Sequence, residues 1–294
     1  MKKAQMQFNW AFVIIAGAVI LGFFVTFTVK YIDTQNMKES AIISNDIYNM
    51  LYNLQGSSFK TDLEVPLGIT ANLDFTCDRM VINNFASESL KKQFIFSPKT
   101  MKTNTLNLWV QQWKYPFKIS NLFYISPKEK KYYILYDEKS APFVLSLDIP
   151  KRFNVEKITT MPNFEDKNVR LISFTSKPGD INIEPNENGK VTINNKEYPL
   201  FGMPLVYGAL FSENYPCLID KLLKRLSEII DIYRTKADYL YTLTPNCDYS
   251  QIKLTLSTLK SKVDSKNYNE IKNYITILNE QNTNLLGNNC QPLY

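Results

Sequence analysis

The sequence predicts an α+β protein in which an N-terminal transmembrane helix continues into a stalk helix, followed by a strand-rich domain packed with a C-terminal antiparallel three-helix region. Three observations support this class. One long apolar segment lies near the N-terminus, short alternating apolar runs fill the middle, and helical periodicity returns in the last third. The divisions are a membrane anchor (1–30), a helical stalk (31–56), a strand-rich extracytoplasmic domain (57–211) and a C-terminal helical region (212–294).

The anchor is the segment 11–29, which contains no charged residue and no proline. As a helix it would span roughly 28 Å at 1.5 Å per residue, close to the hydrocarbon thickness of a lipid bilayer. Trp10 and Tyr31 flank it, as aromatic rings at headgroup depth do. No small-residue cleavage site follows, so we expect an uncleaved anchor rather than a secretory signal or the core helix of a soluble protein.

The orientation of the anchor follows from its flanks. Lys2 and Lys3 precede the span, and Lys30 and Lys38 follow it, so the charge bias is small. A short N-terminal tail is easily retained in the cytoplasm. We therefore expect a single-pass protein of the cytoplasmic membrane, with its N-terminus inside and its C-terminal domain extracytoplasmic. The alternative is a membrane-tethered scaffold facing the cytoplasm, with four reduced cysteines.

The stalk is predicted from apolar residues that recur every three to four positions after the span. Ile43, Ile47 and Leu54 belong to this pattern, and Gly56 ends it. The pattern predicts one continuous or slightly kinked helix that reaches about Gln55.

Strands are predicted where short runs rich in β-branched and aromatic residues lie between Pro, Asn, Asp and Ser clusters. These runs are 69–75, 93–96, 132–136, 143–147 and 169–174. Two further runs, 181–184 and 191–194, alternate around Asn188-Gly189 and predict a hairpin. The stretch 199–211 is too short and too proline-rich for a second span, so it predicts buried core.

Three helices are predicted in the C-terminal region, because apolar stripes at helical spacing cover 218–233, 252–263 and 271–285. Ser250 is the expected N-cap of the second helix, and Gly287 is the expected end of the third. The connections are short, which favours antiparallel neighbours.

Four cysteines, Cys77, Cys217, Cys247 and Cys290, occur without a C-x-x-C pair, so we expect disulfides rather than a metal site. If the helices alternate in direction, Cys247 and Cys290 lie at one end and Cys217 about 30 Å away. Disulfides need Cα atoms within about 7 Å. We predict Cys247–Cys290 and, by elimination, Cys77–Cys217. The alternative pair, Cys217–Cys247, requires residues 238–248 to fold back along the first helix.

The composition argues against several classes of function. The absence of histidine removes Ser-His-Asp and Cys-His nucleophilic sites and His-liganded metals. The nine glycines form no phosphate-binding loop or nucleophile elbow. Basic and acidic residues are interspersed at a net charge of +6, so we expect no nucleic-acid partner. We expect no enzyme, no catalytic or metal-binding residues and no cofactor; the enzymatic alternative is a carboxylate-dependent, glycan-active hydrolase.

Four aromatic residues, Trp109, Trp113, Tyr115 and Phe117, share strand parity. Packing against a core is the simpler interpretation of this pattern. An exposed face of the same residues would instead recognise an envelope or surface protein or a glycan. Pro116 predicts a bulge or a sheet edge, which keeps the surface interpretation open.

The first residues resemble a known processing signal. Residues 2–8, KKAQMQF, resemble the class III signal of archaeal type IV pilin-like proteins. In that family a prepilin peptidase removes a short basic leader before a glutamine. The resemblance implies a leader of residues 1–4, cleavage between Ala4 and Gln5, and self-association through the anchor helix. Pilins usually carry glutamate at the fifth mature position, where this chain has Asn9. The whole chain also resembles uncharacterised single-pass proteins of small-genome archaea, which implies no activity.

These features predict a membrane-anchored cell-envelope protein that displays a non-catalytic extracytoplasmic domain for surface interaction or envelope structure. The alternatives are a pilin-like subunit that assembles through its N-terminal helix and the hydrolase described above.

Overall fold

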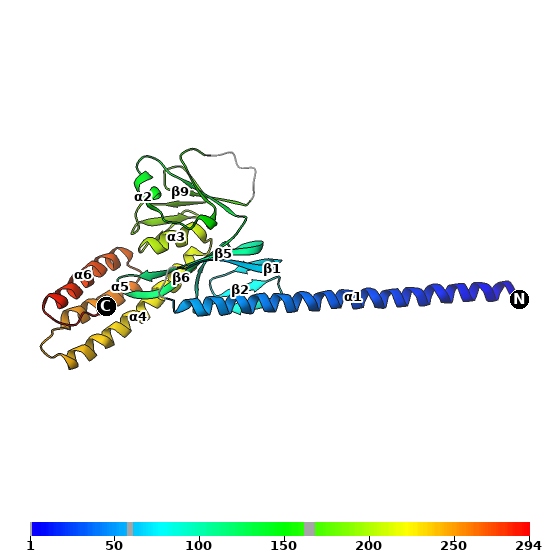
Figure 1. The fold of residues 1–294 in the computed structure, drawn as a ribbon, viewed down its shortest axis with the longest axis horizontal. Coiled ribbons are helices and arrows are strands. Elements are labelled where there is room, and N and C mark those ends of the chain that lie inside the picture. The colour runs from blue at the N-terminus through cyan, green and yellow to red at the C-terminus, as the bar shows by residue number, and fades with distance from the viewer. Residues whose placement is uncertain (1, 58–60, 162–167) are drawn as a thin grey trace.

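The computed structural model describes residues 2–57, 61–161 and 168–294, with side chains described from Trp10 onward except Ala11. The chain forms a mixed α+β structure with one long N-terminal helix, two six-stranded sheets and a group of C-terminal helices (Figure 1). The predicted α+β arrangement, a long apolar N-terminal helix followed by strand-rich sheets and then by C-terminal helices, is therefore confirmed. The predicted strand-rich region 57–211 also includes 58–60 and 162–167, which lie outside the described residues.

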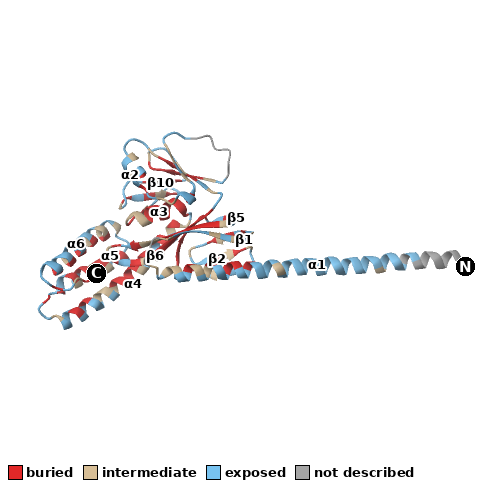
Figure 2. Cartoon of the chain, in the orientation of Figure 1, coloured by how far each residue is buried: buried red, intermediate tan, exposed pale blue. Residues whose placement is uncertain are grey.

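Helix α1 (Lys2–Gln55) joins the predicted anchor and stalk without a break. Among the described residues it is the one helix long and apolar enough to cross a membrane, and none of its most apolar stretch is buried. The side chains begin to be buried at Ser40, and Ile43, Ile47 and Leu51 are buried further along. Figure 2 shows the exposed part of α1 extending away from the rest of the protein.

The first sheet has the strand order β3-β2-β1-β5-β6-β4. Its long antiparallel strands are β1, β5 and β6, and β4 lies parallel to β6. The strands are β1 (Thr61–Phe75), β2 (Arg79–Ile82), β3 (Ala86–Ser89), β4 (Phe94–Phe96), β5 (Thr100–Lys114) and β6 (Lys118–Pro127).

Strand β5 supplies a core on each face of this sheet because its side chains alternate in direction. Leu108 and Val110 pack in the cluster that contains Ile43 and Ile47 of α1. Trp109 and Trp113 belong to the larger cluster on the other face. The first sheet is therefore enclosed between the stalk part of α1 and the rest of the domain.

The second sheet has the strand order β12-β11-β10-β9-β7-β8. Strands β8, β7, β9 and β10 are parallel, and β10, β11 and β12 form antiparallel hairpins, including the predicted one. The strands are β7 (Lys131–Leu135), β8 (Val155–Ile158), β9 (Val169–Ser173), β10 (Ile181–Ile183), β11 (Lys190–Ile193) and β12 (Lys196–Pro199).

The predicted strand at 143–147 is wrong, because this segment belongs to helix α2 (Ala141–Ser146). A proline lies in the first turn of α2, where its missing N–H costs no hydrogen bond. Asp137 also closes the turn before α2 by accepting a hydrogen bond from the Ser140 backbone N–H at 2.9 Å. The short 3₁₀ helix η1 (Lys151–Phe153) follows.

The C-terminal helices are α3 (Met203–Phe211), α4 (Tyr215–Leu243), α5 (Ser250–Asp264) and α6 (Tyr268–Gly287). Helix α3 is buried from Leu205 to its end, so the apolar stretch at 199–211 does lie in the core. Ser250 is the first residue of α5 rather than its N-cap; Tyr249 occupies the cap position. Asp248 accepts the Ser250 backbone N–H instead, at 2.8 Å.

Helices α4 and α5 run antiparallel. Three ion pairs between them show this direction. As the aspartates of α4 advance along the chain, their lysine partners in the segment 253–266 come progressively earlier in the sequence. The pairs are Asp220–Lys266, Asp231–Lys260 and Asp238–Lys253.

Candidate functional site

A cleft of about 980 Å³ lies where three parts of the fold meet. Gln55 contributes from the end of α1, the segments 77–78 and 91–94 contribute from the first sheet, and α4 contributes along 217–228. We call this site the joint cleft. Its volume is at the upper end of the range for small-molecule sites, about 300–1,000 Å³.

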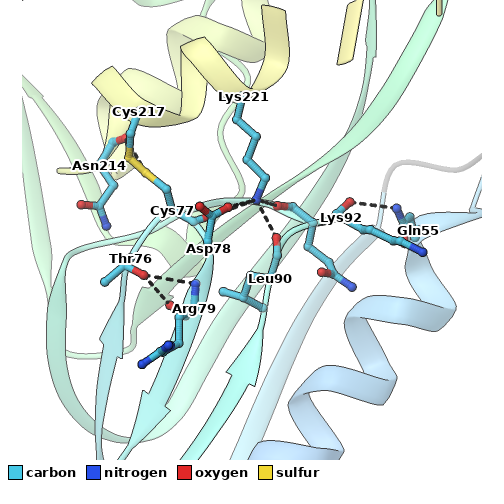
Figure 3. A network of polar contacts seen from close by, with 11 residues as sticks. Gln55, Thr76, Cys77, Asp78, Arg79, Leu90, Lys92, Asn214, Cys217 and Lys221 are labelled. Carbon is cyan, nitrogen blue, oxygen red and sulfur yellow. Dashed lines mark hydrogen bonds and ion pairs between the residues drawn. A yellow bond between two sulfur atoms is a disulfide. The ribbon is translucent and has the colours of Figure 1, made fainter. Parts of the chain in front are cut away.

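Helix α4 is attached to the first sheet by three residues on one of its faces. Asn214, just before the helix, donates from Nδ2 to the Phe75 carbonyl at 2.7 Å. Cys217 forms a disulfide with Cys77, with a Cα–Cα distance of 6.2 Å. Lys221 follows one turn later and reaches the same segment (Figure 3). Residues three and four apart share a helix face, so the three attachments act together.

Lys221 is the most highly coordinated side chain of the cleft. Its Nζ donates to the main-chain carbonyls of Cys77, Leu90 and Gln93 at 2.8, 2.6 and 3.0 Å. Asp78 Oδ1 lies 3.3 Å from the same nitrogen. Burial lowers the pKa of Lys221, and the nearby carboxylate of Asp78 acts in the opposite direction. An ammonium group has three donors, so the carbonyls use all of them and Lys221 acts as a clamp.

The segment held by Lys221 is ordered by local contacts as well. The Thr76 backbone N–H donates to the Arg79 carbonyl at 2.8 Å, and the Arg79 N–H donates back to Thr76 Oγ1 at 3.1 Å. Gln55 at the end of α1 donates from Nε2 to the Lys92 carbonyl at 3.0 Å (Figure 3). The end of the stalk and α4 are therefore both attached to the same stretch of the first sheet.

The charges of the joint cleft divide into paired and unpaired groups. Each carboxylate of the lining forms an ion pair: Asp78 with Lys221, Asp220 with Lys266, and Glu228 with Arg225. Three lysines of the lining, Lys91, Lys92 and Lys224, are exposed. In the described part of the chain, no ion pair joins these three lysines to a carboxylate. The rim of the cleft is therefore positively charged.

The second disulfide lies away from the cleft. Cys247, in the connection between α4 and α5, pairs with Cys290 after the end of α6, with a Cα–Cα distance of 5.8 Å. Cys247 and Cys290 are both buried, whereas Cys217 at the joint cleft is exposed. The structure thus contains the two pairs expected from the helix arrangement and not the alternative Cys217–Cys247.

The four aromatic residues are buried, which agrees with packing against a core, the simpler interpretation, and contradicts the alternative of a recognition surface. Trp109 and Trp113 have no exposed surface, Phe117 is 2% exposed and Tyr115 is 9% exposed. The reason is that Trp109 and Trp113 of β5, and Tyr115 and Phe117 of the turn that follows it, pack in the cluster shared with the second sheet and the C-terminal helices. Trp113 Nε1 donates to the Phe201 carbonyl at 2.9 Å, and Phe117 stacks on Tyr233 at 4.1 Å between ring centroids.

Sequence reasoning did not identify Lys221. The available signal was a lysine four residues after Cys217, placed between the apolar residues of the first C-terminal stripe. Among the described residues, no group of three or more His, Cys, Asp or Glu side chains is placed to hold a metal ion. Ala4 and Gln5 lie in the first turns of α1.

Comparison with known proteins found no match to a family model, to a curated protein or to a solved structure. The description of this protein therefore rests on its own fold. It is an α+β domain with two disulfides, carried on a helix that has the length and composition to cross a membrane.

Proposed function

We propose that this chain is a single-pass membrane-anchored cell-envelope protein that displays a non-catalytic extracytoplasmic domain for surface interaction or envelope structure. The observation that carries the proposal is the division of α1 into two parts. Its apolar part is exposed along its length, with Phe12 at 73% and Phe23 at 67%. Its last turns are buried against the first sheet. A lipid bilayer is the environment that covers an apolar helix surface of this length.

The spacing between the two parts of α1 supports display away from the membrane. The apolar segment ends at Val29, and the first buried stalk residue is Ser40. At 1.5 Å per residue these positions are about 16 Å apart along the helix. The domain thus stands clear of the lipid headgroups while remaining on the same helix.

The two disulfides support an extracytoplasmic location, because disulfides persist in oxidising compartments and are rare in the reducing cytosol. Cys77–Cys217 connects the first sheet to α4, and Cys247–Cys290 closes the C-terminal helices. Both link segments that are far apart in the chain, with sequence separations of 140 and 43.

Labelling of intact cells tests the topology. Cells would be treated with a membrane-impermeant phosphine reductant and then with an impermeant maleimide, and the labelled peptides would be identified by mass spectrometry. We expect Cys217 to be labelled after reduction. A Cys77→Ser/Cys217→Ser double variant, which lacks this target, is the matched control. Thiols that stay unlabelled in intact cells but react without reductant after lysis would reverse the topology.

A pilin-like subunit is a second candidate, favoured by the unbroken course of α1. An exposed apolar half and a sheet-packed second half on one rigid helix would allow copies to associate through their anchors. This candidate requires filaments in sheared cell fractions and an N-terminal peptide that begins at Gln5. Protein that stays in the membrane fraction with an intact Met1 would remove it.

A further inference from the structure

The joint cleft carries more positive charge than its own carboxylates neutralise. Five cationic side chains and three carboxylates line it, an excess of two positive charges. Lys221 and Arg225 already have partners. Asp220 of the lining pairs with Lys266, which lies outside it. Within the described part of the chain, three lysines at the rim, Lys91, Lys92 and Lys224, are therefore left without a carboxylate partner.

We propose that the joint cleft binds an anionic glycan, meaning a chain whose sugars carry carboxylate or sulfate groups beside their hydroxyls. The three rim lysines suit the acidic groups, because ammonium groups form charge-assisted hydrogen bonds with carboxylate and sulfate oxygens. Gln55 and Ser120, with the carboxylates of Asp220 and Glu228, supply donors and acceptors for hydroxyls. This mixed polar lining, beside the single aromatic residue Phe94, fits a hydroxylated ligand better than an apolar peptide.

The position of the cleft excludes the headgroups of the protein's own membrane as its ligand. This step rests on the proposed function, since it takes Val29 as the outer end of the span. Gln55 lines the cleft 26 residues further along α1, about 39 Å away at 1.5 Å per residue. Electrostatic attraction is screened within about 8 Å at physiological salt. The ligand must therefore lie beyond the surface of the bilayer.

The cleft is organised before any ligand binds. Lys91 and Lys92 lie in a segment whose carbonyls at Leu90 and Gln93 are held by Lys221. Lys224 is on the helix that carries this clamp and the disulfide. A site whose backbone is fixed in advance loses less conformational entropy on binding.

The test uses the full chain in nanodiscs of zwitterionic lipid and measures binding by isothermal titration calorimetry. The probe is an oligogalacturonate, which carries one carboxylate per sugar, and a neutral maltooligosaccharide of equal length is the comparison. We expect binding of the acidic probe only, weakening as salt is raised. Replacing Lys91, Lys92 and Lys224 by Gln should raise Kd about tenfold or more, since each rim charge contributes a modest amount.

The matched control replaces Lys102, Lys139 and Lys196 by Gln, because these lysines are also exposed but lie outside the cleft. It removes the same net charge, and we expect it to leave Kd nearly unchanged. Equal weakening in both triple variants, or no binding of the acidic probe, would overturn the assignment to the cleft. Poly-glutamate that binds as tightly as oligogalacturonate would replace the glycan with an acidic peptide. These measurements use purified protein, so their failure leaves the topology to be decided by the labelling of intact cells.

Discussion

Lys221 donates a hydrogen bond to the main-chain carbonyl of Cys77 at 2.8 Å, one helical turn from the disulfide that joins Cys77 to Cys217. One residue of the connection between β1 and β2 is thus held by α4 both covalently and through a partly buried ammonium. The two links have different chemistry, and they can be removed separately.

Replacing Lys221 by Met is expected to lower the free energy of unfolding by about 2–4 kcal/mol, because three main-chain carbonyls lose a charged donor. Urea unfolding of the full chain in detergent micelles, followed by circular dichroism, measures the change. Lys224→Met on the same helix is the control, since Lys224 is exposed and should shift stability by less than about 0.5 kcal/mol. Equal stability of the two variants would contradict the clamp.

The two disulfides are expected to be reduced in a defined order. Cys217 is exposed, whereas Cys247 and Cys290 are both buried, and a thiolate must reach a sulfur to attack it. With increasing dithiothreitol under native conditions, Cys77 and Cys217 should become alkylated before Cys247 and Cys290. Differential alkylation and peptide mass spectrometry follow the order. Simultaneous reduction of both pairs would mean that the domain opens as a whole first.

Two helical glycines provide a matched pair of substitutions. A Cβ at Gly208 in α3 would lie 2.7 Å from the ring of Phe96, whereas a Cβ at Gly287 in α6 would meet nothing within 4 Å. Gly208→Ala should therefore destabilise the protein by about 1–3 kcal/mol through overpacking. Gly287→Ala should be neutral or stabilising by up to about 1 kcal/mol, because alanine favours the helix. Thermal melts of both variants measure the two changes, and a loss of stability in Gly287→Ala as large as that in Gly208→Ala would contradict the difference in packing.

The last residues of the chain are held by Asn282 of α6. Its Oδ1 accepts the Leu293 backbone N–H at 2.6 Å, and its Nδ2 donates to the Tyr294 carbonyl at 2.8 Å. Asn282→Ala leaves these groups without their partner and should cost about 1–3 kcal/mol. Backbone amide hydrogen exchange should also accelerate at Leu293 in the variant. Unchanged exchange at Leu293 would show that Asn282 does not hold this segment.

Asp231 is expected to give a pH-dependent contribution to stability. Hydrogen bonds from Lys260, and then from Arg234, hold the pKa of Asp231 below its ordinary value of 3.8. Its contribution is therefore complete above pH 3.8 and is lost as the pH falls through the lower folded-state pKa. The difference in Tm between wild type and Asp231→Asn should be present at pH 7 and disappear in strong acid. A difference that grows on acidification would contradict this sign.

Much of this fold was predictable because its signals are periodic. The repeat of apolar residues through Ile43 and Ile47 predicted the continuous stalk, and the stripes near Leu222, Leu256 and Leu278 predicted three helices. The alternating directions of these helices then sufficed to predict which cysteines pair. Long elements carry many repeats, so a single exceptional residue does not obscure the pattern.

Short elements were less predictable. The segment 143–147 is rich in apolar residues, which suit a strand or a buried helix equally over so few positions. The hairpin turns at Asn83-Asn84 and Asn194-Asn195 have positive φ angles, but two asparagines are a weaker signal than Asn-Gly. The joint cleft was not predictable from local patterns, since it combines residues from α1, the first sheet and α4.

Because α1 is unbroken, the rotation of the domain about the helix axis is fixed relative to the N-terminal part of the helix. Each helical residue turns the chain by about 100°, so the direction in which the joint cleft faces is fixed relative to the exposed apolar part of the same helix. One residue inserted between Val29 and Ser40 would swing the cleft by that angle while raising it only about 1.5 Å. Seven inserted residues would nearly restore the direction in which the cleft faces and would move the domain about 10 Å further along the helix axis. The number of residues in this part of α1 thus sets both the distance of the domain from the apolar segment and the direction in which the joint cleft faces.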